Sequence, residues 1–240
     1  MRFILTEDYE ELSRRAAEII AAQVREKPAC VLGLATGSTP IGAYRELARM
    51  YREEGLDFSR ARSFNLDEYY PMSPDHPQSY RYFMEKNLFS EINLPREMTA
   101  VPSGDTDNPP ETCRAYDAAI EDAGGIDLQL LGIGQNGHIG FNEPDDTLYA
   151  STHLTPLTED TIRANARFFS SAAEVPTHAI SMGMGSILRA RKILLLVSGK
   201  NKHEALKNLY HDKIDPHCPA TFLKLHPDAT VICDSEAYNG

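Results

Sequence analysis

A glycine-rich segment carries the side chains with the clearest chemical potential: LGIGQNGHIGFNEP at 131–144. It presents His138 between glycines and places Glu143 close behind it in the sequence. Histidine titrates near neutral pH, and a carboxylate partner fixes its tautomer and raises its basicity. The pattern favours acid–base chemistry at His138 over a purely structural histidine. A zinc site is weakly supported, because matching Cys or His ligands at the usual spacing are missing.

The same segment contains the spacing G-x-G-x-x-G at Gly132, Gly134 and Gly137, which invites a dinucleotide-binding interpretation. A dinucleotide fingerprint should open a long helix, whereas residues 138–144 contain further structure breakers. No acidic residue ends a second paired strand at the proper interval. We therefore expect a rigid turn that presents His138, and no bound dinucleotide.

A second segment, FNLDEY at 64–69, ends an apolar run in two acids. Neighbouring residues of an extended chain point in opposite directions, so only one of Asp67 and Glu68 should enter a crevice. Acids also decorate many helix N-termini, where they complement the helix dipole. Both interpretations stay open for this segment taken alone.

A third segment, GLATGSTP at 33–40, suits an anion. Free backbone amides and the hydroxyls of Ser38 and Thr39 lie at a predicted helix start, where the positive end of the helix dipole favours a phosphate. An ordinary Ser/Thr helix cap explains the same residues equally well.

A fourth segment, SGKNKH at 198–203, runs from a predicted strand into a helix. Lys200 and Lys202 lie at the helix start, where the dipole disfavours cations. A bound anion would offset that cost. Solvent-exposed lysines with a small unfavourable contact are the alternative.

These segments need a scaffold that brings them together, and apolar runs alternate with helix-period runs along the chain. Such alternation predicts right-handed βαβ units, hence a doubly wound α/β fold whose mostly parallel sheet carries helices on both faces. Ligands bind at the carboxyl ends of such strands, so the four segments should share one crevice. The expected strands are 30–34, 62–66, 126–131, 178–181, 192–197 and 229–233; the expected helices are 7–26, 40–54, 77–89, 110–122 and 200–210.

Length and composition fit one globular domain over residues 1–240. The net charge of −11 argues against nucleic acid or an anionic membrane as a partner, because both are bound by massed Lys and Arg. Four scattered cysteines predict free buried thiols in a reducing compartment. With no signal-peptide pattern and no apolar run of membrane length, we expect a cytoplasmic protein.

Taken together, the segments resemble the glucosamine-6-phosphate deaminase family, in the family's order and over most of the chain. The resemblance implies a sugar-phosphate isomerase and lactonase type of fold, with no metal or organic cofactor. It implies a small sugar phosphate as the partner molecule, and the conversion of glucosamine 6-phosphate to fructose 6-phosphate and ammonium in amino-sugar catabolism. The matching segments are LATGSTP (34–40), FNLDEY (64–69), HPQSYRYFM (76–84), LGIGQNGHIGFNEP (131–144), TIRANARFF (161–169) and SGKNKHEAL (198–206).

The resemblance also implies roles for single residues. Asp67 would be the base that moves a proton between C2 and C1 of the open-chain sugar. His138 would open the sugar ring, with Glu143 as its partner. The substrate phosphate would be bound by Gly37, Ser38, Thr39, Arg167 and Lys202.

Two departures from the family pattern carry expectations. Asn136 stands where many members have Asp, so this position adds no negative charge to stabilise the protonated ring of His138, and we expect the ring to lose its proton more readily than it would beside an Asp. Asparagine remains able to accept a hydrogen bond from the imidazole. Residues 142–161 contain no Lys or Arg, whereas allosteric members bind an effector there through basic side chains. We expect no such activation, and either a monomer or a homo-oligomer.

Two other functions compete. A 6-phosphogluconolactonase would share the fold, but Tyr69 follows the two acids where lactonases typically show Arg, and lactone hydrolysis has little use for a C2 proton shuttle. A non-catalytic sugar-phosphate sensor would need only the phosphate-binding residues and an attached DNA-binding module, and residues 1–30 offer no helix-turn-helix. The presence of Asp67, His138 and Glu143 favours catalysis over both.

Overall fold

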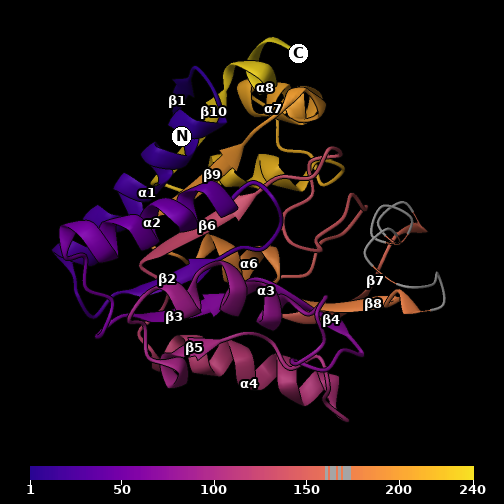
Figure 1. The fold of residues 1–240 in the computed structure, drawn as a ribbon. Helices are drawn as coiled ribbons and strands as arrows, with labels where there is room; N and C mark the ends of the chain where they lie inside the picture. The colour runs from indigo at the N-terminus through magenta and orange to yellow at the C-terminus, as the bar shows by residue number, and fades with distance from the viewer. Residues whose placement is uncertain (160–161, 163–165, 167–168, 170–173) are drawn as a thin grey trace.

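A seven-stranded parallel sheet forms the centre of the molecule (Figure 1). The computed structural model describes residues 1–159, 162, 166, 169 and 174–240. The strands lie in the order β1-β10-β9-β6-β2-β3-β5, and every neighbouring pair is parallel. Their bounds are β1 Arg2–Thr6, β2 Val31–Leu34, β3 Arg62–Asn65, β5 Thr99–Ala100, β6 Leu128–Gly132, β9 Ile193–Val197 and β10 Ala229–Asp234.

Helices cover both faces of the sheet, as the alternating pattern predicts (Figure 1). One face carries Leu32 and Leu194 and packs against α1 Tyr9–Glu26, α2 Ile41–Glu54 and α3 Tyr80–Asn87. The opposite face carries Leu131 and Leu195 and packs against α4 Pro109–Asp122, α6 Met184–Leu188, α7 His203–Tyr210 and α8 Ser235–Asn239. The central strands are therefore buried on both sides and read as nearly continuous apolar runs.

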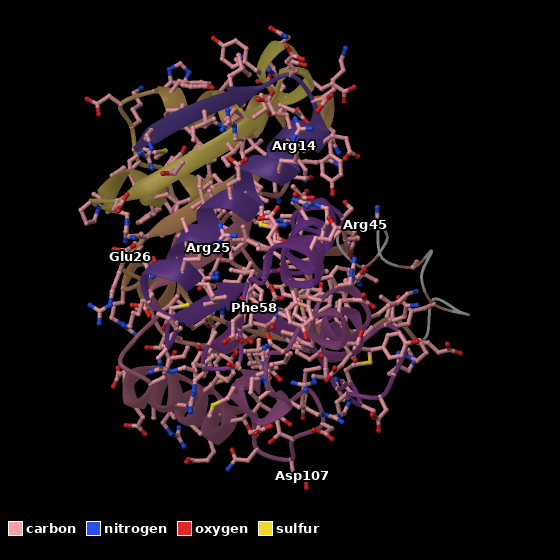
Figure 2. The ribbon with its side chains drawn as sticks, turned by 60° about the vertical axis from the view of Figure 1, so that its left-hand side comes forward. Arg14, Arg25, Glu26, Arg45, Phe58 and Asp107 are labelled. Carbon is pink, nitrogen blue, oxygen red and sulfur yellow. The ribbon has the colours of Figure 1, made fainter. Side chains whose placement is uncertain are left out.

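Helix α1 illustrates why the sequence forms this layer. Leu12, Ala16 and Ile20 recur at helical spacing and are at most 1% exposed. Arg14 and Arg25 lie on the exposed side of the same helix (Figure 2). An amphipathic helix of this kind gains most of its stability from packing its apolar stripe on the sheet.

A second, antiparallel sheet of three strands lies to one side of the main sheet (Figure 1). Its order is β4-β8-β7, formed by Asp67–Tyr70, His178–Ser181 and His153–Pro156. The expected strand at 178–181 therefore belongs to this sheet and not to the parallel one. The chain enters it directly from β3, with Leu66 between the two strands.

Other expectations differ from the structure at element ends. The helix expected from residue 77 begins at Tyr80, because the side chain of Ser79 accepts a hydrogen bond from the Tyr82 backbone and caps it. Lys200–Lys202 forms a 3-10 turn ahead of α7.

The cysteines are buried and free, as predicted. Within the described residues, no helix is long and apolar enough to cross a membrane. Further 3-10 helices among the described residues are Phe89–Glu91, Arg96–Met98 and Pro219–Leu225.

The direction of strand addition reverses beside β2. From β2 the chain adds β3 and β5 toward one edge, then returns to β6 on the other side of β2 and adds β9 and β10 toward the opposite edge. Loops leaving the two sides of such a reversal diverge and open a crevice at the carboxyl ends of the strands. The glycine-rich segments at 33–40 and 131–144 leave β2 and β6, so they border this crevice.

Candidate active site

His138 and Glu143 form a hydrogen-bonded pair in the loop that follows β6. The ring Nδ1 lies 3.2 Å from Oε2 of Glu143. The same carboxylate oxygen accepts a hydrogen bond from Nδ2 of Asn136 at 2.8 Å, and Oδ1 of Asn136 accepts one from the His138 backbone N–H. Asn136 thus orients the carboxylate and the loop, and its oxygen is engaged by the backbone rather than by the imidazole. The contact expected from the sequence, an acceptance of a hydrogen bond from the imidazole by Asn136, is not formed; the backbone N–H of His138 occupies that oxygen.

Glycine is required where this loop folds back on itself. A Cβ atom at Gly134 would lie 2.5 Å from the His138 ring, so any larger residue would displace that ring. Gly137 has a φ of 86°, and a Cβ there would lie 2.3 Å from Sγ of the buried Cys218. The spacing that resembles a dinucleotide fingerprint therefore serves to seat the histidine. No long helix follows it: the next regular element along the chain is β7.

Asp67 occupies the start of β4, beside the glycine-rich loop. Its Oδ2 lies 3.4 Å from the position that a Cβ atom would take at Gly140. Ser181 is the partner of Asp67 in the neighbouring strand. The Ser181 hydroxyl accepts the Phe141 backbone N–H at 3.1 Å and does not donate to Asp67. The side chain is only 6% exposed, and no described residue donates a hydrogen bond to its carboxylate. Burial, reinforced by the charge of neighbouring Glu68, raises the pKa of Asp67 to about 8.

Glu68 points away from that crevice, as the alternation of an extended strand requires. Its carboxylate accepts three backbone N–H groups, from Tyr69 at 2.9 Å, Tyr80 at 2.8 Å and Arg81 at 2.9 Å. Two of these donors belong to the first turn of α3. Of the two adjacent acids, only Asp67 faces the glycine-rich loop, which confirms the prediction that just one would enter the crevice.

The loop after β2 has the geometry of an anion cradle. Gly37 adopts a φ of 96°, and helix α2 begins after Pro40 without a side-chain cap. Among the described residues, no partner engages the hydroxyls of Ser38 and Thr39. The helix-cap alternative is therefore wrong, and both hydroxyls remain available to a ligand. Tyr9 braces this loop, since its hydroxyl donates to the Ser38 carbonyl and accepts the Gly42 N–H.

Lys202 lies in the turn after β9, half-buried, and burial lowers the pKa of its ammonium group. Within the described ranges it has no carboxylate at ion-pair distance. Lys200, two residues earlier, is exposed. A half-buried cation of this kind favours an anionic ligand nearby. Buried Asp234 holds the turn by accepting bonds from Ser198 Oγ and the Gly199 N–H.

An open depression of about 380 Å³ connects this turn with the loop after β2. Ser198 lines it together with Ser38 and Thr39, so the predicted anion-binding segments of two different strands border the same hollow. The other lining residues are Tyr9, Ile41 and Arg45.

The structure thus brings most of the predicted residues to one edge of the sheet. Arg167 is the exception, because it lies outside the described residues. Tyr69 and Phe141 are buried and pack in a small apolar cluster. Sequence reasoning missed Tyr9, Ser181 and Asp234; Asp234 was detectable as an acid at the end of a predicted strand, whereas the contacts of the other two depend on tertiary structure.

The arrangement combines an acid–base pair, a buried carboxylate of raised basicity, two hydroxyls without a described partner and a half-buried cation. Groups of these kinds suit the binding of a phosphate and the transfer of protons. The described residues contain no group of three His, Cys, Asp or Glu side chains placed to hold a metal ion.

Comparison with known proteins gives a consistent result. The family described as glucosamine-6-phosphate isomerases/6-phosphogluconolactonase matches residues 6–232. A glucosamine-6-phosphate deaminase of Thermoanaerobacter pseudethanolicus is 56% identical over 99% of this chain and 94% of its own length. One from Clostridium perfringens is 54% identical over 99% of this chain and 98% of its own length.

Solved structures agree with this. A monomeric glucosamine-6-phosphate deaminase superposes with a TM-score of 0.97 at 45% identity, covering 100% of this chain and 99% of the other. A 6-phosphogluconolactonase from Thermotoga maritima superposes with a TM-score of 0.75 at 22% identity, covering 97% and 98%. The second likeness shows a shared fold alone.

Proposed function

The chain belongs to the family of glucosamine-6-phosphate isomerases and 6-phosphogluconolactonases, and we propose that within it this chain is an enzyme that converts glucosamine 6-phosphate and water to fructose 6-phosphate and ammonium. Full-length relatives above 50% identity that carry this activity in their names support the proposal. The structural observation that carries it is Asp67, a buried carboxylate without a hydrogen-bond donor among the described residues, placed beside the loop of His138. Lactone hydrolysis removes no carbon-bound proton and so has no need for such a base.

Substrate binding begins in this proposal with the phosphate. The hydroxyls of Ser38 and Thr39, the amides around Gly37 and the ammonium group of Lys202 would hold it, and Arg167 is carried over from the sequence motif. Because the phosphate is remote from C1 and C2, its binding energy serves to position the reacting carbons.

Ring opening follows, and we assign it to His138. The imidazole takes the proton of the C1 hydroxyl and returns a proton to the ring oxygen as the C1–O5 bond breaks. Glu143, hydrogen-bonded to Nδ1, fixes the ring orientation and stabilises its protonated form. The product is an open-chain aldehyde whose C2 proton has become acidic.

Asp67 then acts as the base. Its carboxylate removes the C2 proton while the aldehyde oxygen takes a proton from the ammonium group on C2, which gives an enolamine. The protonated Asp67 then returns its proton to C1, which leaves a protonated imine at C2. Water adds to that carbon, and the resulting carbinolamine expels ammonia to form the ketone. A carboxylate whose pKa lies near 8 is a stronger base than an exposed aspartate, and this suits proton abstraction from carbon.

The absence of Lys and Arg from residues 142–161 extends the proposal to regulation. We expect hyperbolic kinetics from a monomer without an effector site, in line with the monomeric relative of TM-score 0.97. Sigmoidal kinetics relieved by N-acetylglucosamine 6-phosphate would contradict this part.

The deciding experiment measures ammonia release from glucosamine 6-phosphate with coupled detection of fructose 6-phosphate. Stoichiometric formation of both products supports the proposal. If folded protein releases no ammonia, the deaminase assignment fails, and hydrolysis of 6-phosphogluconolactone is then assayed to identify the lactonase alternative. Inactivity in both assays, with sugar-phosphate binding retained, would indicate a sensor.

A further inference from the structure

We infer that Glu68 is a positioning residue for the reaction: its carboxylate, held by three backbone N–H groups, fixes the strand that presents Asp67 and keeps a second negative charge next to that base. This inference rests on the proposed function, in which Asp67 moves the proton. It gives a role to the one acid of the FNLDEY segment that does not face the crevice.

Glu68 has a mechanical role in holding β4. Glu68 joins β4 to the first turn of α3, because Oε1 accepts from Tyr69 and Tyr80 and Oε2 accepts from Arg81. The strand is short, so its four residues depend on such anchors. A close approach on the same side excludes a side chain at position 104: a Cβ at Gly104 would lie 2.3 Å from the Tyr69 carbonyl and 3.0 Å from Cγ of Glu68.

Glu68 also has an electrostatic role. Glu68 is 2% exposed, and no cation among the described residues pairs with it. Three N–H donors favour its ionised form, whereas Asp67 has no described donor and is the harder of the two to ionise. Burial raises the pKa of Glu68 to about 7, and the three N–H bonds oppose the rise. The two acids therefore ionise in sequence, and the charge already present on Glu68 makes Asp67 the stronger base.

The other groups facing this pair do not supply a competing charge. Tyr69, Tyr80 and Tyr116 surround it, and burial raises the pKa of each, so all three stay neutral near pH 7. The guanidinium of Arg81 is directed to Thr99 and to Glu85, with which it forms an ion pair at 2.6 Å. Among the described residues, the charge that bears on Asp67 is consequently that of Glu68.

The test titrates the Asp67 carboxyl carbon by NMR in substrate-free protein, identified by its loss in Asp67→Asn. Glu68→Gln removes the charge and keeps the size, so the Asp67 midpoint should fall by about one pH unit. Glu68→Asp keeps the charge, so the midpoint should stay near the wild-type value while the melting temperature falls. A midpoint that is unchanged in Glu68→Gln overturns the inference, as does an equal fall in both variants.

Asp127→Asn is the matched control, because Asp127 is another buried carboxylate that accepts a backbone N–H but lies at the opposite end of the strands. It should lower the melting temperature and leave the Asp67 midpoint in place. If Glu68→Gln fails to fold, the wild-type titration decides: Glu68 must ionise at a lower pH than Asp67, and the reverse order overturns the inference. The titration uses no substrate. A failed ammonia assay would therefore contradict the proposed function without affecting the result of the Asp67 titration.

In the active enzyme, the same shift of the Asp67 midpoint should change the pH dependence of the reaction rate. The acidic limb of kcat/KM for Glu68→Gln should move to lower pH by the amount seen in the titration, with a lower plateau because the weaker base transfers the proton more slowly. A purely structural role would reduce the amount of folded enzyme without moving that limb.

Discussion

Two buried aspartates at opposite ends of the strands have opposite surroundings. Asp127, just before β6, accepts hydrogen bonds from Lys27 at 2.8 Å, the Val31 N–H at 2.8 Å and Arg191 at 3.1 Å. Burial alone would raise its pKa, but these bonds and the two cations outweigh burial and lower it. Asp67, just after β3, has no described donor, and its pKa is raised to about 8.

The comparison separates stability from chemistry within one sheet. At the amino ends of the strands, the buried charge of Asp127 is compensated, so it contributes to stability at neutral pH. At the carboxyl ends, a carboxylate and an ammonium group lack compensation among the described residues, which costs stability and leaves both groups available to a substrate. Uncompensated buried charge is therefore the physical sign of the site here.

The largest effect should come from Asp67→Asn. Loss of the base should reduce kcat at least ~10²-fold. The same change should stabilise the fold by about 1–3 kcal/mol at pH 8, because ionising Asp67 costs the native state. The sign follows from the raised pKa: that cost grows as pH rises between 3.8 and about 8. Urea unfolding at pH 4 and pH 8 checks this, and a variant less stable than wild type at pH 8 would break the comparison.

Lys202 and Lys200 allow a similar comparison between a half-buried and an exposed cation. Lys202→Gln should raise KM by about 10- to 100-fold with a smaller change in kcat, since it removes a charge-assisted contact to phosphate. Lys200→Gln, at the exposed neighbour, is the control and should change KM little. Steady-state kinetics with both variants decides, and equal effects would remove Lys202 from the phosphate site.

Asp127→Asn should lower the free energy of unfolding by about 2 kcal/mol at neutral pH and leave kcat unchanged, because it breaks charge-assisted bonds far from the crevice. Its pKa is lowered in the fold, so its contribution is present above the unfolded value and disappears as pH falls through the folded value. Denaturation curves of wild type and variant should therefore converge in acid. A constant gap at every pH would contradict the role assigned to its charge.

The smallest effect should come from Asn136→Asp. A carboxylate there would replace the 2.8 Å hydrogen bond to Glu143 with a like-charge contact and stabilise a proton on the His138 ring. The part of the pH–rate profile that reflects protonation of the His138 ring should move to higher pH by less than about one unit. Superimposable profiles for wild type and variant would show that the residue at 136 does not tune the ring.

The sequence predicted the parallel sheet because its strands are continuous apolar runs, such as ILLLV in β9, separated by amphipathic helices. It missed β1, whose pattern is short and whose pairing partner lies at the other end of the chain. It also missed the antiparallel sheet as a unit, because the DEYY and HLTP strands carry few apolar residues in sequence.

The parts of the candidate site whose residues lie within one short sequence motif could be predicted. His138 and Glu143 are close in sequence, and their 3.2 Å contact confirms that pairing. The contacts of Asn136 and Glu68 could not be predicted, because they depend on which way an amide turns and on where α3 begins. Roles for Arg167 and the phosphate-binding residues remain predictions.

Strand β10 lies between β1 and β9, pairing Arg2 with Thr230 and Ala229 with Ile193. On a translating ribosome, the first strand to emerge can therefore enter the sheet only after nearly all the rest of the chain has been synthesised. Until then, the free edge of β9 is exposed to other nascent chains. Contacts of such large sequence separation slow folding. Expression at lower temperature or with chaperones should therefore increase the yield of this protein more than any change at the crevice.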